Sequence, residues 1–409
     1  MNVLFLHQNF PSQYQHVVRH LAGQPGNRVV FLTRDNDNRI PGVERVCYEP
    51  FRNAGSQTHH YLREAEAAVI AGQSVYEAAL RLKRDGLTPD IMIGHNGWGE
   101  TLYLKDVWPD VPLLSYFEFY YRATGVDVGF DPAFPTGPND PPRVRTKNLI
   151  NLLGAEAADW GQTPTRWQWS LYPDFVRQKT VVIHEGIDTA IARPDAGARL
   201  RLSDGPTLTP GDEVITFVAR NLEPYRGFPV FMRALPEVLR LRPNAQVLIV
   251  GGDGVGYGAP PPPGKSFRQI MLEEVGDRLD LRRIHFLGKI AHGDFIKVLQ
   301  ISAAHVYLTY PFVLSWSMLE AMSAGCLVIG SATPPVQEVV RHGENGLLFD
   351  FFDIEALVET IVKALERRDE QYPLRSAARA TVLSNYDLKT VILPKYLDII
   401  DNIINRHFF

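Results

Sequence analysis

Short apolar runs and stretches of helical periodicity alternate along the first half of the chain. The apolar runs predict strands, which cover residues 3–6, 29–32, 91–93, 113–116 and 181–183. An Ala-rich segment at 61–82 predicts a long helix, and the spacing of Ser12 and Gln15 predicts a capping box that starts an earlier one. Such alternation is typical of a parallel sheet covered by helices.

The alternation restarts in the second half, after a polar stretch at 190–213 whose Gly and Pro residues suit a linker or a peripheral insertion. Strands are predicted at 214–218, 247–250, 284–286, 306–308 and 327–329, and helices at 228–241, up to residue 299, and within 310–331. We therefore predict an α/β protein with two doubly wound, Rossmann-like domains, at 1–188 and 189–386. A C-terminal helix at about 387–409 has enough apolar positions to pack back on the first domain.

Two such domains facing each other would form an interdomain cleft lined by the carboxyl ends of both sheets, where open α/β sheets bind ligands. Candidate site residues are therefore expected just after strands. The segment 117–145 is aromatic, Pro-rich and longer than ordinary connections. Its length predicts a functional excursion or a partly mobile loop.

Composition and charge exclude several classes of protein. The 409 residues are 45% hydrophobic, which suffices for a large core, and the net charge of -4 provides no field to attract nucleic acid. Cys47 and Cys326 lack the spacing of a zinc site or a disulfide framework, which suits a reducing compartment. No segment reaches the ~20 apolar residues of a membrane span, and the first residues lack a signal peptide's basic region and cleavage site. A cytoplasmic protein without a metal is expected.

Two arginines mark a candidate phosphate site in the second domain. In FVARNLEPYRGF, Arg220 follows a predicted strand and Arg226 precedes Gly227 at the turn into a helix. Guanidinium groups beside a helix start suit a diphosphate, although an isolated pair is about as often two solvated surface arginines. The Gly-rich run GGDGVGYG fits no GxGxxG register, which argues against a dinucleotide-binding dehydrogenase.

The stretch YPFVLSWSMLEAMSAGCLVIGS predicts a second part of this site. If its helix starts near Ser315 or Ser317, backbone N–H groups there can hold phosphate or sugar oxygens. Glu320 lies roughly 5 to 7 Å further along the axis at ~1.5 Å per residue, a separation suited to a ribose diol. Alternatively, Ser317 and Glu320 have the S-x-x-E spacing of a capping box, and Glu320 then only closes the helix start.

The set of motifs resembles a known family. VARNLEPYRG, NAQVLIVGGDG, IHFLGKI, LEAMSAGCLVIGS and EVVRHGENGLLFD are similar, in order and spacing, to the nucleotide-binding domain of the family 4 glycosyltransferases. VVIHEGIDTAIARPD looks like the interdomain strand of that family, with Glu185 in place of the usual Asn. LHQNFPSQY, IGHNGWGE and YFEFYYRATGVDVGFDP resemble the N-terminal domain of a bacterial subgroup associated with polysaccharide assembly.

The resemblance implies a GT-B fold, a nucleotide-sugar donor, net retention at the anomeric carbon and no metal. Arg220 and Arg226 match the basic pair that holds the donor diphosphate, and Glu320 matches the acid associated with ribose. The family's first acid, which contacts the donor sugar, is replaced by Phe312, which we expect to pack against a ring face or fill the space under the turn. The other donor-binding residues implied are Gly288, Lys289, Ile290, Ser315, Trp316 and Ser317.

In the first domain, His95 matches a histidine that the family places near sugar and acceptor, and its alternative is a structural histidine at a strand end. The first-strand loop is expected close to the donor and comprises Asn9, Phe10, Ser12 and Gln13. Glu118, at the end of a predicted strand, is a candidate acceptor contact or else a buried or capping carboxylate.

The expected function is a retaining transfer of a hexosyl group from a nucleotide sugar, with UDP favoured over GDP, to a hydroxyl of a glycan or lipid-linked acceptor. His95, Arg220 and Arg226 are the expected catalytic residues. The alternatives are a GT-B sugar-nucleotide epimerase and a catalytically weak subunit that binds nucleotide sugars. The basic run at 143–147 would allow peripheral contact with an anionic inner membrane face, although such a run is more often a solvated loop.

Overall fold

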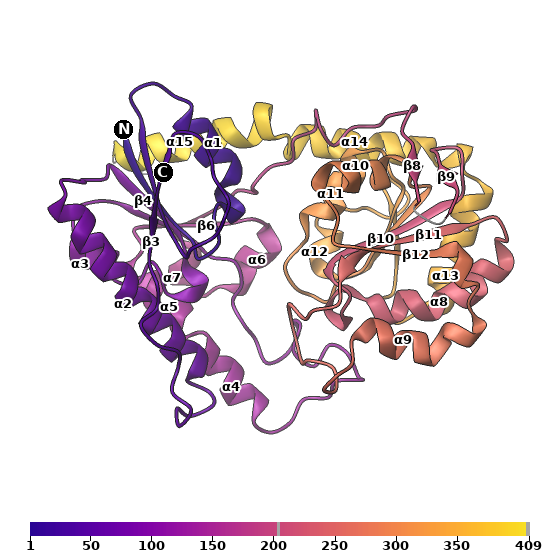
Figure 1. Ribbon diagram of the computed structural model, residues 1–409, viewed down its shortest axis with the longest axis horizontal. Helices are drawn as coiled ribbons and strands as arrows, with labels where there is room; N and C mark the ends of the chain where they lie inside the picture. Colours follow the sequence, from indigo (N-terminus) through magenta and orange to yellow (C-terminus); the bar gives the residue numbers. More distant parts are fainter. Residues whose placement is uncertain (203–204, 406–409) are drawn as a thin grey trace. The chain divides into compact units, whose positions relative to one another are not determined.

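The computed structural model describes residues 1–202 and 205–405, and Figure 1 shows its elements. The chain divides into two compact units. Unit 1 is Met1–Gly186 with Leu388–Phe409, and unit 2 is Ile187–Asp387. The last four positions of the predicted C-terminal helix, 406–409, lie outside the described residues, as do 203–204 in the polar stretch.

Unit 1 contains a seven-stranded parallel sheet in the order β3-β2-β1-β4-β5-β6-β7. Its strands are β1 (Asn2–Leu6), β2 (Arg28–Thr33), β3 (Val43–Cys47), β4 (Ile91–His95), β5 (Leu113–Tyr116), β6 (Trp160–Thr163) and β7 (Thr180–Val182). The central strands β1 and β4 are buried along almost their whole length, which explains their continuous apolar runs.

Helices cover both faces of this sheet. They are α1 (Gln15–Ala22), α2 (Arg63–Arg84), α3 (Leu104–Val107), α4 (Asp140–Lys147), α5 (Leu149–Ala157), α6 (Arg166–Leu171), α7 (Asp174–Arg177) and α15 (Leu393–Ile404), with 3-10 turns η1 (Ser12–Tyr14) and η2 (Asn96–Trp98) and a π-helical turn η7 (Leu388–Ile392). The predicted Ser12 capping box is wrong. Ser12 has φ 47° within η1, and α1 starts at Gln15 without a side-chain cap, because the chain turns once before the helix begins.

The last helix, α15, belongs to the core of unit 1. Tyr396, Ile400 and Ile403 lie in one apolar cluster with Val17 and Leu21 of α1. Figure 1 shows α15 beside α1. The period of three to four residues between the buried positions of α15 is that of an amphipathic helix with one face on the core.

Unit 2 contains a six-stranded parallel sheet in the order β12-β11-β10-β13-β14-β15. Its strands are β10 (Val214–Asn221), β11 (Gln246–Gly252), β12 (Ile284–Gly288), β13 (Ala304–Tyr307), β14 (Val328–Ser331) and β15 (Leu347–Phe349). The polar stretch at 190–213 contributes a short antiparallel pair, β8 (Leu200–Arg201) and β9 (Thr207–Leu208).

The helices of unit 2 complete a doubly wound layer structure (Figure 1). They are α8 (Phe228–Leu241), α9 (Phe267–Val275), α10 (His292–Gln300), α11 (Trp316–Ser323), α12 (Pro334–Gln337), α13 (Ile354–Glu366) and α14 (Tyr372–Asn385), with 3-10 turns η3 (Pro224–Arg226), η4 (Gly276–Arg278), η5 (Leu281–Arg283) and η6 (Asp369–Gln371). Apolar side chains of α10, α11 and α14 form one buried cluster with those of β13 and β14.

Both large sheets reverse their strand order at one point. The first strand of each sheet has its successors on one side and a later strand on the other, so the reversals lie between β1 and β4 and between β10 and β13. Loops diverge from the carboxyl ends of the strands at such points and leave room for a ligand. Side chains that follow these four strands are therefore the first candidates for a site.

Candidate active site

The reversal point of unit 1 holds two buried histidines. His7 follows β1 and His95 ends β4, and their ring centroids lie 5.2 Å apart. Nδ1 of His7 accepts the N–H of Asn9 at 2.8 Å, and Nδ1 of His95 accepts the N–H of Gly97 at 2.9 Å. In the neutral form each ring must therefore carry its proton on Nε2.

Aromatic rings hold His95 in one orientation. Trp98 stacks on it at 4.2 Å between centroids and Tyr116 at 5.1 Å, with interplanar angles of 23° and 24°. Burial lowers the pKa of His95 well below its usual value, and the neighbouring His7 lowers it further. His95 is thus a neutral donor whose Nε2 lies 3.7 Å from Oε2 of Glu118, just beyond hydrogen-bond distance.

Glu118 connects His95 with the first-strand loop. Its Oε1 accepts a long hydrogen bond of 3.5 Å from Nε2 of Gln13, and Ser12 Oγ donates to Oε1 of Gln13. The side chain of Glu118 is 30% exposed, so it remains accessible to a ligand. The structure therefore brings His95, Glu118, Ser12 and Gln13 together, while their roles toward a substrate stay predictions.

The other two predicted loop residues differ in exposure. Asn9 is exposed, and its backbone N–H is taken by His7. Phe10 is 2% exposed, and its ring packs edge-on against Phe31 at 4.8 Å. The side chain of Phe10 is therefore a core residue in this structure.

The buried carboxylate of Glu185 holds the aromatic ring that stacks on His95. Tyr116, which stacks on His95, donates its hydroxyl hydrogen to Oε1 of Glu185, and both side chains are buried. Nε2 of His184 lies 3.5 Å from Oε2 of Glu185. Glu185 stands where the family that the sequence resembles usually has an Asn, but only the fold reveals that Glu185 anchors the aromatic ring stacked on His95.

A second buried carboxylate lies nearby in unit 1. Glu100 is 1% exposed and accepts a hydrogen bond of 2.8 Å from the hydroxyl of Tyr48. Burial raises the pKa of Glu100 to about 7, although the Tyr48 hydrogen bond opposes this shift. No local signal in the sequence singles out Glu100, because its burial depends on the packing of η2 against the sheet.

The carboxyl ends of three neighbouring strands of unit 2, β10, β11 and β12, bring two cations close together. Asn221 of β10 pairs in register with Gly252 of β11, and Val250 pairs with Gly288 of β12. Arg220 is exposed beside Asn221, and Lys289 is exposed after Gly288. A Cβ on Gly252 would lie 2.6 Å from Cε of Lys289, so the lysine side chain passes over the end of β11.

These two cations have no ion-pair partner among the described residues. The other arginine of the pair differs, since Arg226 is only 7% exposed. Its Nη1 donates to Oγ1 of Thr309 at 3.0 Å and to the carbonyl of Val313 at 2.8 Å. Burial opposes its charge, but interactions with Tyr307, Tyr257 and Glu223 outweigh burial and raise the pKa of Arg226.

Gly227 makes this position of Arg226 attainable. It has φ 69°, and a Cβ there would lie 2.3 Å from Cβ of Leu308. A left-handed turn in contact with Leu308, the residue directly after β13, thus admits only glycine without rearrangement. The turn directs Arg226 back across the end of β13.

Aromatic rings enclose the guanidinium of Arg226. Its Cζ lies 5.3 Å from the ring centroid of Tyr257 and 6.0 Å from that of Phe312. Phe312 is 5% exposed and meets Tyr257 at 4.7 Å and Tyr225 at 5.4 Å, both edge to face. The expectation that Phe312 fills the space under its turn therefore agrees with its burial.

Glu223 ties the Gly-rich loop to this cluster. It is fully buried, and Oε2 accepts the N–H groups of Gly256 at 2.9 Å and Tyr257 at 2.8 Å. Burial raises the pKa of Glu223, against the effect of these hydrogen bonds and of the two arginines. Glu223 and Tyr257 lie within the quoted runs FVARNLEPYRGF and GGDGVGYG, but they were not among the predicted site residues because neither the spacing nor the resemblance assigned them a role.

The start of α11 decides between the two interpretations of Glu320. Ser315 is the N-cap, and its Oγ accepts the N–H of Ser317, so Glu320 lies beyond the position that a capping box requires. The capping-box alternative is therefore wrong. Instead Oε1 of Glu320 lies 2.7 Å from Nε2 of His292, the first residue of α10. Trp316 and Ile290 pack at the margin of the apolar cluster around α11.

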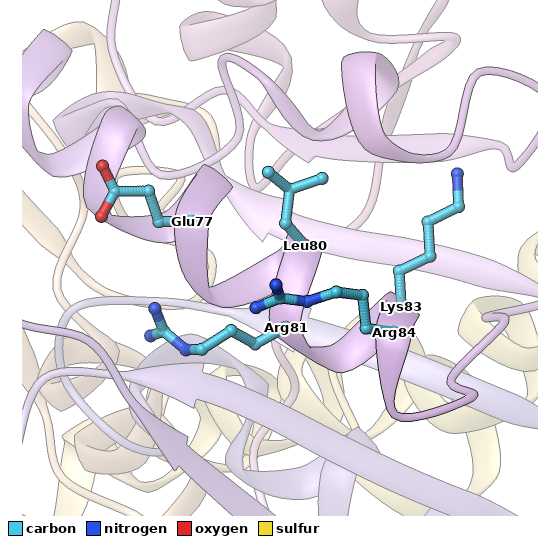
Figure 2. Close-up of a pocket in the computed structure, with 5 residues that line it drawn as sticks. All are labelled: Glu77, Leu80, Arg81, Lys83 and Arg84. Carbon is cyan, nitrogen blue, oxygen red and sulfur yellow. The ribbon is translucent and has the colours of Figure 1, made fainter.

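A surface hollow on α2 of unit 1 is lined by none of these residues. Figure 2 shows its lining of Glu77, Leu80, Arg81, Lys83 and Arg84. All five come from one helix, and cations in the last turn of a helix complement its dipole without a ligand. We assign no site there.

The described ranges contain neither a candidate metal-binding cluster nor a candidate membrane-spanning helix. No group of three or more His, Cys, Asp or Glu side chains in residues 1–202 and 205–405 is placed to hold a metal ion. Within the same ranges, no helix combines the length and apolar character that crossing a membrane requires.

Comparison with known proteins identifies the family. Residues 25–192 match the profile described as "Glycosyl transferase family 4 group", and residues 203–381 match "Glycosyl transferases group 1". The chain belongs to the family 4 glycosyltransferases. This family 4 member is 28% identical over 191 residues to a phosphatidylinositol N-acetylglucosaminyltransferase subunit of Arabidopsis thaliana, covering 46% of the chain and 36% of the relative.

Another curated relative is a phosphatidyl-myo-inositol mannosyltransferase of Mycobacterium leprae, 30% identical over 184 residues, with 44% of each chain covered. The family 4 chain thus spans less than half the length of these two relatives. Among solved structures, sucrose-phosphate synthase of Thermosynechococcus elongatus has a TM-score of 0.76 at 17% identity, covering 99% of this chain and 100% of that one. HepE of Anabaena in complex with UDP and glucose has a TM-score of 0.65 at 16% identity, covering 98% and 99%. These likenesses confirm the predicted GT-B fold.

Proposed function

We propose that the protein is a retaining glycosyltransferase that moves a hexosyl group from a nucleotide diphosphate sugar, preferably a UDP sugar, to a hydroxyl of a glycan or lipid-linked acceptor without a metal. One observation carries this proposal. Arg220 and Lys289 stand exposed, without ion-pair partners among the described residues, at the carboxyl edge of neighbouring strands. Cations left unpaired at such an edge suit an anionic ligand.

The diphosphate is the part of the donor that these groups fit. As the glycosidic bond breaks, negative charge accumulates on the leaving diphosphate, and preorganised cations stabilise it. Arg220 and Lys289 would contact the phosphate oxygens. Arg226 would add its charge from a buried position, where the Thr309 and Val313 hydrogen bonds keep the guanidinium in place. The first N–H groups of α11 supply further positive potential.

The remaining donor contacts follow from neighbouring residues. Glu320 would accept hydrogen bonds from the ribose hydroxyls, and Gly288, Ile290 and the backbone of Lys289 would frame the base. UDP and glucose are the ligands named for the HepE structure, and they are the two components of a donor of the proposed class. Phe312 provides no hydrogen bond in place of the family's first acid, so the donor sugar must be held by other groups.

On unit 1, His95 and Glu118 are the proposed acceptor and sugar contacts. The Nε2–H of neutral His95 can donate to a sugar oxygen but cannot remove a proton. The acceptor proton would instead pass to the departing phosphate, as attack from the same face requires. We place the reaction in the cytoplasm, in polysaccharide assembly. Membrane contact through 143–147 would rest on Arg145, since Arg143 pairs with Asp140 and Lys147 with Glu64.

The proposal is tested with labelled UDP sugars and GDP sugars and a panel of acceptors. A transferase yields glycosylated acceptor and free nucleotide, an epimerase yields an isomerised donor, and a binding subunit yields neither. Arg220→Ala should weaken binding of UDP about tenfold, the equivalent of roughly 1.4 kcal/mol. Arg240→Ala is the matched control, because Arg240 is an exposed arginine of α8 in the same unit that pairs with Glu237. Equal binding by both variants and the parent chain would contradict the proposed donor site.

A further inference from the structure

A hydrogen bond between two helices restrains the proposed ribose-binding acid. Nε2 of His292 lies 2.7 Å from Oε1 of Glu320. His292 is the first residue of α10, and Glu320 lies in the second turn of α11. The side chain of Glu320 is 16% exposed and that of His292 is 59% exposed, so the contact lies at the surface of unit 2.

We propose that His292 is a positioning residue that orients Glu320 toward the ribose of the donor nucleotide. This inference rests on the proposed function, in which Glu320 accepts the ribose hydroxyls. His292 itself would not contact the donor. No sequence motif singles out His292, and its position three residues after Lys289 gives no sign of the contact across to α11.

The two carboxylate oxygens of Glu320 have different partners. Oε1 is engaged by His292, while Oε2 has no hydrogen-bond partner among the described residues and remains available to a diol. A glutamate side chain has three rotatable bonds, and ordering them at the moment of binding weakens the complex. A hydrogen bond that orders the carboxylate before the ligand arrives removes part of that loss.

Local charges favour the protonated histidine. The hydrogen bond with Glu320 raises the pKa of His292, and partial burial opposes the rise. On α10 itself, Asp294 pairs with Lys297 at 3.0 Å, and on β8, which packs against α10, Arg201 is exposed. Glu320 is therefore the charged group from α11 that decides the state of His292.

A merely structural pair predicts a different behaviour. An exposed ion pair of this kind contributes little to stability, and its loss would leave nucleotide binding unchanged or lower the affinity for every nucleotide equally. A positioning role predicts that the loss appears only when the nucleotide has ribose hydroxyls. The ribose is thus the variable that separates the two interpretations.

The test measures binding of UDP and of its 2′,3′-dideoxy analogue to the full chain by calorimetry. His292→Ala should weaken UDP binding about fivefold, the loss expected for one hydrogen bond of about 1 kcal/mol, and should not change binding of the dideoxy analogue. His292→Gln should restore most of the affinity, since its amide can donate to Glu320. Lys297→Ala is the matched control, because Lys297 is an exposed cation of the same helix.

The pH dependence gives a second readout. UDP affinity of the parent chain should fall as the pH rises through the raised pKa of His292, and His292→Gln should lack this step. Equal losses for both nucleotides in His292→Ala, or no loss although Glu320→Ala weakens UDP binding, would overturn the inference and leave the proposed function intact. Unchanged UDP binding in both Glu320→Ala and Arg220→Ala would instead overturn the proposed donor site, and this inference with it.

Discussion

Replacement of Phe312 by glutamate would restore the acid of the family's first signature position, and the structure predicts a loss of stability. The ring is 5% exposed and packs against Tyr257 and Tyr225. Truncation of a buried phenylalanine costs about 3–5 kcal/mol. Glutamate keeps part of the carbon volume but places a carboxylate in an aromatic setting.

Arg226 offsets part of this cost. Its Cζ lies 6.0 Å from the Phe312 ring centroid, and two unit charges at that separation attract by roughly 3 kcal/mol at an effective dielectric constant of 20. The buried carboxylate of Glu223, which holds the Tyr257 loop, opposes the new charge. We therefore expect Phe312→Glu to destabilise unit 2 by about 2–4 kcal/mol, and Phe312→Leu, which keeps the site apolar, by about 1–2 kcal/mol.

These changes in the stability of unit 2 are measured by urea unfolding, with limited proteolysis as the probe of which unit unfolds. UDP binding and sugar turnover are measured on the same samples. Phe352→Glu is the control, because Phe352 is 41% exposed and its replacement should change stability by less than about 0.5 kcal/mol. Suppose instead that Phe312→Glu keeps the stability of the parent chain and changes only the choice of donor sugar. The ring would then face the sugar, and its assignment to the core would be refuted.

Three further predictions concern single contacts. Gly227→Ala should destabilise unit 2 by about 2–4 kcal/mol in urea unfolding, because a left-handed turn and contact with Leu308 are both strained; an unchanged midpoint would show that the turn relaxes freely. Tyr116→Phe should lower the stability of unit 1 by about 1–3 kcal/mol, since it removes one hydrogen bond to the buried carboxylate of Glu185; equal stability would exclude a supporting role. Burial raises the pKa of Glu100 from 4.5 to about 7, so between these pH values the folded state retains a proton that the unfolded state releases. The free energy of unfolding should therefore fall by roughly 3 kcal/mol as the pH rises from 4.5 to 7. Denaturation at several pH values should show a smaller fall in Glu100→Gln, and parallel curves for the two proteins would disprove the shift.

The order of strands and helices could be predicted where the apolar pattern is strong. The buried runs of β1, β4, β10 and β11 were all found, because strands covered on both faces need continuous apolar residues. The strands β3, β6 and β15 were missed, as was the short pair β8 and β9. Two of these, β3 and β15, lie at sheet edges with partly exposed residues, so their sequences lack that signal. The segment 117–145 was predicted to be a functional excursion or a partly mobile loop. Residues 117–139 contain no helix or strand, but the remainder lies in α4 (Asp140–Lys147), so the basic run 143–147 stands on a helix and not in a loop.

Local sequence also suggested two capping boxes, at Ser12 and Ser317, that the structure does not form, although α11 does start near Ser315 as predicted. Both Ser12 and Ser317 have the spacing of a capping box, but η1 delays the first helix and Ser315 caps the other. A cap depends on the backbone angle at which the chain enters the helix, and that angle is set by the packing of the preceding loop. The four-residue pattern of a capping box does not specify that backbone angle.

The sequence by itself determined the chemical inventory of this protein: two α/β halves, the cations Arg220 and Lys289, and an acid at Glu320. Only the tertiary structure decided which of these groups face solvent. It buried Arg226 among aromatic rings, paired Glu320 with His292, and placed Tyr116 and Glu185 beneath His95. Apolar periodicity is a local property that each segment carries alone, whereas burial and pairing of a polar side chain arise from segments distant in the chain that meet only after folding.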